Sequence, residues 1–285
     1  LTEVGEFGKK NKITVVSPWK SGSKISEDNP YFIQMRTGLR DHFFKIVEDA
    51  LEEFEAENIY ILGREENRED ATYSRILQSM ASAILGTADE APLRNFLLNE
   101  DSLMYGKYAF DKLFDEKSAK CFLLPNWSFS KDENFVYNVT RKMSGEKGLN
   151  ELVLYGLPIL FESDKINFEL YRSLNMRVCR SSYVDPNSPF VRAFKQAYFE
   201  RFNDFPADEA FEAYDMMLFI GRNLFRYGTG FQYFLDQAED ELIQTKFDIR
   251  RVFDEEGMDK FDDIEYFQNQ HLYILRFEDE RFVAY

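Results

Sequence analysis

The chain has 285 residues, of which 44% are hydrophobic and 30% are charged, and its formal net charge is −16. A chain of this length and composition is globular and can bury one large core or two of medium size. The negative charge disfavours nucleic acid as a partner, because binding to phosphates depends on clusters of Lys and Arg. No window approaches the roughly 18 consecutive apolar residues that a membrane span needs.

The first apolar run is ITVVSPW at residues 13–19, which is rich in β-branched residues and ends at a Ser-Pro pair. This pattern predicts a buried strand. Apolar residues then recur at helical spacing from Thr37 to Asn58, with Thr37 placed to cap the helix. The short run NIYILG at residues 58–63 is typical of a buried parallel strand.

The alternation of helix and strand continues along the chain. Helices are predicted at residues 72–85, 103–114, 134–144 and 165–175, and strands at 91–98, 120–126, 151–158 and 176–184. Strands that alternate with helices of this length indicate βαβ units, a parallel sheet and right-handed crossovers. The predicted fold class is therefore α/β.

The alternation stops after Val184. Two long helices are predicted within residues 188–228, the first capped by Ser188 with a proline in its first turn and the second closed by Gly228. The tail alternates apolar and polar residues around EDE at 278–280, which predicts a terminal antiparallel hairpin or edge strands. The two prolines of VDPNSP, residues 184–189, mark a candidate domain boundary.

Three stretches resemble the type 1 periplasmic-binding-protein family of branched-chain amino-acid receptors and their envelope relatives. They are NKITVVSPWKSGSKISEDNPYFIQMRT, SPFVRAFKQAYFERFNDFPADEAFEAYDMM and NQHLYILRFEDERFV. The segments NKITVVSP and NPYFIQ are most similar to Bacteroidetes envelope proteins, some of which carry peptidoglycan-binding LysM modules. The resemblance implies two doubly wound parallel-sheet lobes joined by a hinge, the first from residues 1–36 and 186–262 and the second from 37–185 and 263–285.

The first lobe is expected to be incomplete in this chain. Several βα units precede the Ser-Pro strand in the family that it resembles, whereas LTEVGEFGKKN precedes it here. A lone strand with two helices cannot pair its backbone groups or cover its apolar face. We therefore expect the natural protein to be longer, or a partner chain to supply the missing strands.

In a two-lobed α/β protein the ligand binds at the carboxyl ends of the strands, in the cleft between the lobes. The candidate ligand-binding residues follow predicted strands: Ser17, Trp19, Lys20, Asn126, Trp127, Ser128, Glu162 and Ser163. Tryptophan offers a large flat face with one hydrogen-bond donor, which suits a binding cleft. The resemblance implies that Trp127 falls near the position where the amino-acid receptors place an aromatic residue against the ligand. It implies that Glu162 falls near the position where those receptors hold the ammonium group of the ligand.

Each of these residues also has a purely structural interpretation. The two tryptophans are equally consistent with packing of one lobe against the other, because aromatic residues are common at domain interfaces. Glu162 is equally consistent with a helix-capping role beside Ser163. Cys121 and Cys179 lie in apolar runs, which predicts free, buried thiols.

The sequence contains no recognisable catalytic, metal or cofactor motif. His42 and His271 lack the spacing of a zinc site. The predicted function is a non-enzymatic binding domain of the bacterial cell envelope, periplasmic or associated with the outer membrane, that takes a small polar ligand. The alternative is a structural or regulatory domain with a degenerate cleft that binds an envelope protein or peptidoglycan. A third option, an enzyme on a doubly wound sheet, has no nucleophile, base or metal constellation in its favour.

Overall fold

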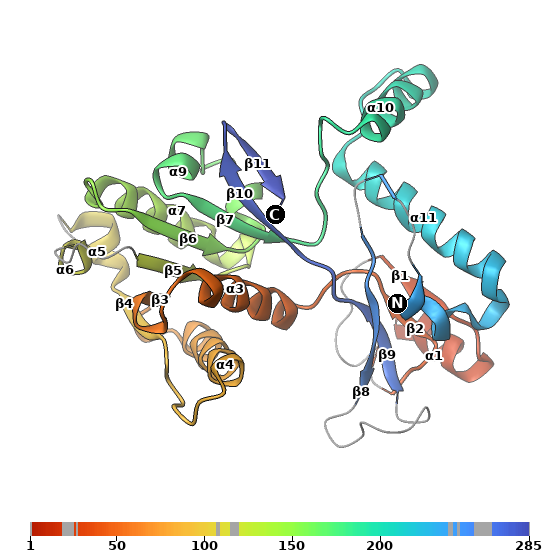
Figure 1. The fold of residues 1–285 in the computed structure, drawn as a ribbon, viewed down its shortest axis with the longest axis horizontal. Helices are drawn as coiled ribbons and strands as arrows, with labels where there is room; N and C mark the ends of the chain where they lie inside the picture. Colours follow the sequence, from red (N-terminus) through yellow and green to blue (C-terminus); the bar gives the residue numbers. More distant parts are fainter. Residues whose placement is uncertain are drawn as a thin grey trace. The chain divides into compact units, whose positions relative to one another are not determined.

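A computed structural model describes residues 2–18, 26, 28–106, 109–114, 120–238, 242–243, 246–253 and 264–284. Its contacts divide the chain into two compact units (Figure 1). Unit 1 contains Leu1–Gly38 and Ser181–Leu272, and unit 2 contains Leu39–Arg180 and Tyr273–Tyr285. The chain passes from one unit to the other after Gly38, after Arg180 and after Leu272.

Unit 2 is built on a seven-stranded sheet with the order β11-β10-β7-β6-β5-β3-β4. Strands β3 to β7 are parallel to one another, whereas β10 runs antiparallel to β7 and to β11. The strands are β3 (Ile59–Arg64), β4 (Arg94–Leu98), β5 (Lys120–Leu124), β6 (Leu152–Gly156), β7 (Met176–Arg180), β10 (Tyr273–Glu278) and β11 (Arg281–Ala284). Every residue of β3, β5 and β6 is buried, as expected of parallel strands covered on both faces.

Helices cover both faces of this sheet (Figure 1). On one face α3 packs against α4, and on the other α7 packs against α5, α8 and α9. The helical segments are α3 (Leu39–Glu53), the 3-10 helix η1 (Ala56–Asn58), α4 (Arg68–Leu85), α5 (Glu100–Tyr105), α6 (Asp111–Phe114), α7 (Phe129–Glu146), α8 (Ile159–Glu162) and α9 (Phe168–Ser173). This is the three-layer arrangement of a doubly wound α/β domain.

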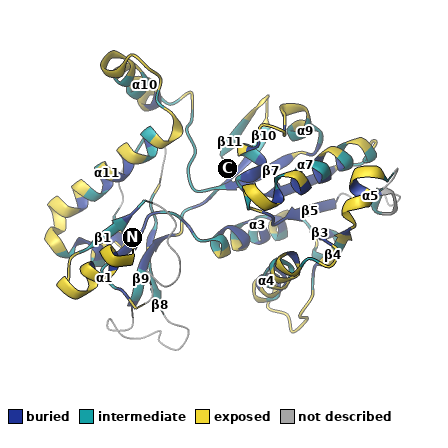
Figure 2. Ribbon diagram, turned by 180° about the vertical axis from the view of Figure 1, so that it is seen from behind, coloured by how far each residue is buried: buried dark blue, intermediate teal, exposed yellow. Residues whose placement is uncertain are grey.

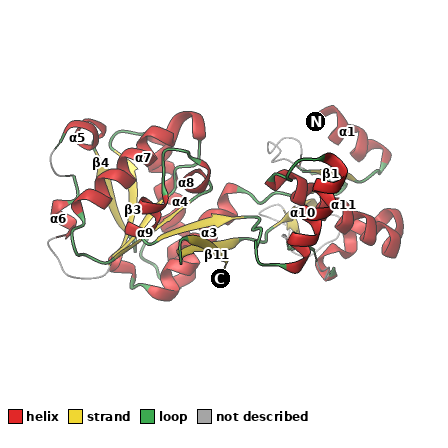
Figure 3. Ribbon diagram, turned by 90° about the horizontal axis from the view of Figure 1, so that it is seen from above, coloured by secondary structure: helices red, strands yellow, loops and turns green. Residues whose placement is uncertain are grey.

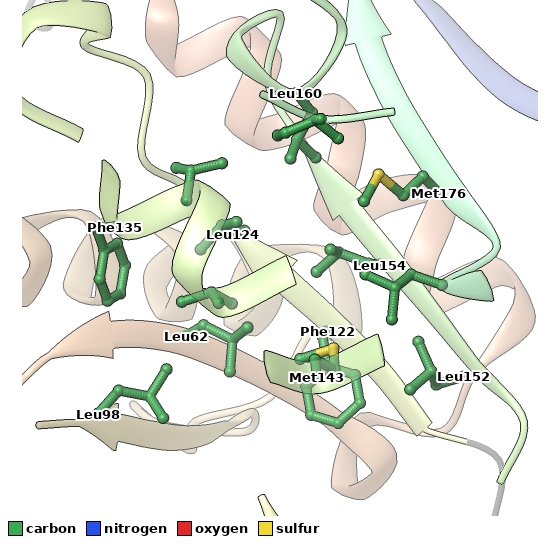
Figure 4. Packing of buried hydrophobic residues seen from close by; sticks show 14 of the residues in the cluster. Leu62, Leu98, Phe122, Leu124, Phe135, Met143, Leu152, Leu154, Leu160 and Met176 are labelled. Atoms are coloured by element: carbon green, nitrogen blue, oxygen red, sulfur yellow. The ribbon is translucent and has the colours of Figure 1, made fainter. Parts of the chain in front are cut away.

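The largest apolar core lies between the sheet and α7. Figure 4 shows side chains of neighbouring strands meeting two residues of α7, and all of them are buried: Leu62, Phe122, Leu124, Leu154, Phe135 and Met143. Phe122 and Leu124 are two residues apart on β5, so they point to the same face of the sheet. The core therefore depends on the period-two register of the central strands.

Unit 1 has a four-stranded sheet with the order β1-β2-β9-β8. The strands are β1 (Val15–Ser17), β2 (Phe32–Gln34), β8 (Ile249–Phe253) and β9 (Ile264–Asn269), and the helices are α1 (Thr2–Asn11), α10 (Pro189–Phe202), α11 (Asp208–Tyr227) and the 3-10 helix η2 (Gly228–Gln237). Met216 and Phe219 of α11 pack on Ile33 and Phe267 of the sheet. Among the described residues, no helix of either unit is both long enough and apolar enough to cross a membrane.

The expectation that the first strand would stand without strand partners is wrong. β1 pairs in parallel with β2, which comes from the NPYFIQ segment, and β2 pairs in parallel with β9. Short segments from both ends of the chain thus supply backbone partners that the sequence pattern did not reveal. The sequence-based division also placed residues 263–285 in one lobe, whereas β9 belongs to the sheet of unit 1 and β10 to that of unit 2.

Other elements follow the sequence pattern closely. The terminal hairpin is confirmed, since β10 and β11 pair across Asp279 and Glu280. Both turn residues have positive φ values, 47° and 63°, as a type I′ turn requires. Cys121 and Cys179 are free and buried, as predicted. The helix predicted at 103–114 is instead two short helices, and α8 was not predicted.

The central role of β5 in the core can be tested by truncating one side chain. Phe122→Ala removes a fully buried ring, so we expect the free energy of unfolding to fall by about 3–5 kcal/mol in urea denaturation. Phe168→Ala is the matched control, because Phe168 is exposed on α9 and its loss leaves no cavity. Equal effects of the two substitutions would contradict the described core.

Candidate functional site

The candidate site lies where the order of strands in unit 2 changes direction. β3 is flanked by β4 on one side and β5 on the other, so the chain moves outward from β3 to β4 and then crosses back to β5. In open parallel sheets, ligands bind outside the carboxyl ends of the strands at such a switch point. The side chains that follow β3 and β5 are therefore the ones to consider.

Arg64 is the last residue of β3, and its guanidinium is buried. Nε and Nη2 donate to the two carboxylate oxygens of Asp70, each over 2.8 Å, and Nη2 also donates to Oδ1 of Asp132 over 2.8 Å. The guanidinium lies over the ring of Phe135, 4.9 Å from its centroid. Hydrogen bonds and the charge of Asp70, followed by those of Asp132, raise the pKa of Arg64 above its ordinary value.

The two carboxylates come from the first turns of two helices. Asp70 lies in the first turn of α4, where the side chain of Asn67 caps the helix by accepting from the backbone N–H of Glu69 and of Asp70. Asp132 lies in the first turn of α7 and accepts from the backbone N–H of Ser128 over 3.0 Å. Carboxylates are stabilised at helix N-termini by the helix dipole. Arg64 thus joins both helices to the end of β3.

Asn126 completes the group that we call the strand-end cluster: Arg64, Asp70, Asn126 and Asp132. It follows β5 and is fully buried, and its Nδ2 donates to Oδ1 of Asp70 over 3.0 Å. Its Oδ1 is buried and accepts no hydrogen bond from any described residue. A buried amide oxygen without a donor is costly and is uncommon in native structures.

Trp127 lies next to the cluster and is 44% exposed. Its Nε1 donates to the hydroxyl of Tyr73 over 3.0 Å, and Tyr73 in turn packs edge-on against Phe43. Burial raises the pKa of Tyr73 above its ordinary value. The indole is thereby fixed at its nitrogen while a large part of its surface faces solvent.

The carboxyl end of β6 leads to a second polar group. The hydroxyl of Ser163 donates to Glu133 over 2.8 Å, and Lys165 donates to the other oxygen of the same carboxylate over 2.7 Å. These hydrogen bonds, that of Lys165 first, lower the pKa of Glu133. Glu162 ends the short helix α8, so it does not directly follow a strand, and its carboxylate lies 3.9 Å from Arg180.

The structure brings together only part of the residue set predicted from sequence. Asn126, Trp127 and Ser128 lie at the switch point, whereas Ser163 and Glu162 belong to the group around Glu133 and Arg180. Ser17 is buried in β1 of unit 1, where its carbonyl accepts from Met35 over 2.9 Å. Trp19 and Lys20 lie outside the described residues.

Sequence reasoning missed Arg64, Asp70, Asp132 and Tyr73. The strand was predicted at residues 58–63 and therefore stopped one residue short of Arg64, which is the last residue of β3. The signal in the sequence was an arginine directly after a fully apolar run, followed by Asn67 and the acidic residues that open α4. The contact with Asp132 joins residues 68 positions apart and leaves no local pattern.

The strand-end cluster combines two carboxylates with one guanidinium, which leaves one negative charge in excess. Its three charged groups are bound to one another, and no serine, cysteine or histidine nucleophile takes part. Within the part of the chain that the structure describes, no group of three or more His, Cys, Asp or Glu side chains is placed to hold a metal ion. A neutral or cationic donor group suits this charge balance.

Comparison with solved structures identifies the architecture. A putative branched-chain amino-acid ABC transporter protein from Rhodospirillum rubrum matches with a TM-score of 0.63 and 12% identity over 100% of this chain and 76% of its own. An ABC transporter substrate-binding protein from Desulfitobacterium hafniense, in complex with Leu, matches with a TM-score of 0.60 and 11% identity over the same shares. The chain has the type 1 periplasmic binding fold. At these identities the likeness establishes the fold alone.

The same fold relates the chain to LpoA from Haemophilus influenzae, with a TM-score of 0.53 and 11% identity over 99% of this chain and 50% of LpoA. No protein-family model matches the sequence. No curated protein matches it either. The fold is therefore known from structural similarity, and the chemistry of the site depends on this chain's own residues.

Removing the central cation tests whether the strand-end cluster is a single unit. Arg64→Met leaves Asp70 and Asp132 as buried carboxylates without their cation, so we expect a loss of about 3–5 kcal/mol in the free energy of unfolding. Arg68→Met is the matched control, because Arg68 is exposed at the start of α4. If both variants unfold at the same urea concentration as the unmodified chain, Arg64 does not hold the cluster together.

Proposed function

We propose that this chain is a non-enzymatic ligand-binding domain of the bacterial cell envelope and that it binds a small polar molecule at the strand-end cluster. The observation that carries the proposal is Trp127, which is held by Tyr73 with much of its surface exposed, next to a buried cluster at the topological switch point. A rigid aromatic face beside convergent polar groups is the usual composition of a small-molecule site.

The charge of the cluster favours a ligand with a donor group. The carboxylates of Asp70 and Asp132 outnumber the guanidinium of Arg64, and Oδ1 of Asn126 is a buried acceptor without a donor. A protonated amine or a neutral N–H or O–H group would complement this balance, while an apolar part of the ligand would stack on Trp127. The Leu complex of the Desulfitobacterium hafniense protein is consistent with a ligand of this size.

A location in the periplasm or at the outer membrane follows from the same proposal. Several structural neighbours are ABC transporter substrate-binding proteins, and another is LpoA. The resemblance of NKITVVSP and NPYFIQ to Bacteroidetes envelope proteins, some with LysM modules, supports the same placement. Peptidoglycan or a protein of the envelope would then lie within reach of the domain.

A second candidate function is a structural or regulatory interaction domain with a degenerate ligand site. The observation in its favour is the set of exposed apolar side chains on α10 and α11 in unit 1, because large exposed apolar patches mark interaction surfaces. Under this alternative no small molecule binds at the strand-end cluster, and Trp127 only packs against its surroundings.

The ligand proposal is tested by calorimetry with a panel of L-amino acids and of the corresponding amines, which lack the carboxylate. We expect at least one member to bind the unmodified chain and Trp127→Ala to weaken that binding by about tenfold, or 1.4 kcal/mol. Phe44→Ala is the control, because Phe44 is 43% exposed on α3, close to the value for Trp127.

If Trp127→Ala binds the ligand with unchanged affinity, Trp127 is not part of the binding site. The absence of binding by every member of the panel would favour the interaction domain.

A further inference from the structure

Helices α3 and α4 of unit 2 enclose a groove that is separate from the strand-end cluster. The two helices pack against each other on one face of the sheet (Figure 1). The groove between them has a volume of about 430 Å3, and no residue of the strand-end cluster lines it. Volumes of roughly 300 to 1,000 Å3 are usual for small-molecule sites. We call this feature the α3–α4 groove.

Apolar side chains from both helices line the α3–α4 groove. Leu39 and Phe43 come from α3, and Ile76 and Met80 come from α4. The members of each pair are four residues apart, so they lie on the same side of their helix. Phe43 and Met80 are buried, whereas Leu39 and Ile76 are half-buried. The groove therefore offers an apolar surface that an apolar chain or ring can cover.

The charge of the α3–α4 groove comes from two arginines. Arg40 of α3 and Arg75 of α4 are exposed lining residues, and neither forms an ion pair with a carboxylate of the described residues. Arg75 donates instead to the hydroxyl of Thr72 over 3.2 Å. Both helices carry acidic residues and the chain has a net charge of −16, yet no acidic side chain is among the described residues that line the groove. The groove is thus a cationic site on an acidic chain.

The walls of the groove are regular helices and not loops (Figure 3). α3 has 15 residues and α4 has 18. Figure 2 shows exposed residues along α4, on which Arg75 lies. Phe43 is fixed from the side by the ring of Tyr73, whose centroid lies 5.5 Å away. Sites built on helices hold their side chains more precisely than sites on loops.

We propose that the α3–α4 groove is a second ligand site and that it takes an organic carboxylate with an apolar chain or ring. The carboxylate binds Arg40 and Arg75, because the planar guanidinium matches a carboxylate with two parallel hydrogen bonds. The apolar part covers Leu39 and Ile76. The strand-end cluster has an excess of negative charge and favours the opposite kind of group, so the two sites select different molecules.

Ligand-observed NMR titration of the chain with hexanoate tests this site. The hexylammonium ion, 1-hexanol and acetate serve as probes of the charge and of the apolar part. We expect hexanoate to bind at least about tenfold more tightly than each of the three. We also expect its affinity to fall when the salt concentration rises from about 50 mM to about 500 mM, because exposed charges are screened.

Substitutions within the groove show where hexanoate binds. Arg40→Gln combined with Arg75→Gln removes both charges at exposed positions, and we expect it to weaken the binding of hexanoate at least about tenfold. Ser79→Phe places a ring in the groove from another exposed lining position and should weaken binding as well. Arg68→Gln is the matched control, because Arg68 is exposed on α4 but does not line the groove, and its affinity should be unchanged.

Equal affinities for hexanoate and 1-hexanol would show an apolar crevice without a preference for anions and would overturn the proposal. An unchanged affinity for hexanoate in the double arginine variant would overturn it too. Loss of hexanoate binding in Trp127→Ala, but not in the double arginine variant, would assign the acid to the strand-end cluster and would likewise overturn it. If Ser79→Phe fails to fold, the double arginine variant alone decides, because both of its substitutions are at exposed positions.

Discussion

The buried ion pairs of Arg64 are the interaction on which the rest of unit 2 depends. One guanidinium binds two carboxylates, and these belong to the first turns of α4 and α7, on opposite faces of the sheet. Breaking such a group by removing one partner is far more costly than the pairs are stabilising in themselves, because an uncompensated charge stays buried. The cluster therefore acts as a geometric constraint more than as a source of stability.

This constraint positions the side chains that face solvent. Asp70 receives a hydrogen bond from Asn126, and the next residue, Trp127, is fixed through its indole nitrogen by Tyr73 of α4. Asp132 holds the backbone of Ser128 at the start of α7. The loop after β5 is thus held from both sides, so Trp127 presents a fixed surface, which is the preorganisation that the proposed ligand site requires.

The elements that could be predicted from sequence are those with a local cause. The period of α3, the apolar runs of β5 and β6 and the turn residues of the β10–β11 hairpin all lie within one short stretch of sequence. The pairing of β2 with β9 joins segments from the two ends of the chain, and three residues of β2 carry too little pattern to predict it. Long-range pairing of this kind has no signature in a single sequence.

The residues of the candidate site also divide into those with a local cause in the sequence and those that depend on long-range contacts. Asn126, Trp127 and Ser128 were predicted because they directly follow a clear strand, and the position of a strand end is a local property. Arg64 and Asp132 were missed because their contact depends on which strands are neighbours in the sheet. Glu162 was expected directly after a strand, but it lies at the end of α8. A single turn of helix with apolar residues has the same short apolar run as a strand, so the sequence does not tell the two apart.

The central claim is that unit 2 holds a small molecule at the strand-end cluster. It is tested most directly by purifying the chain from its native host without denaturation, unfolding it, and identifying by mass spectrometry any small molecule that is released. The account predicts about one molecule per chain, with an N–H or O–H donor group and an apolar part that can stack on an indole. A chain that releases no small molecule, or one that lacks a donor group, would contradict it.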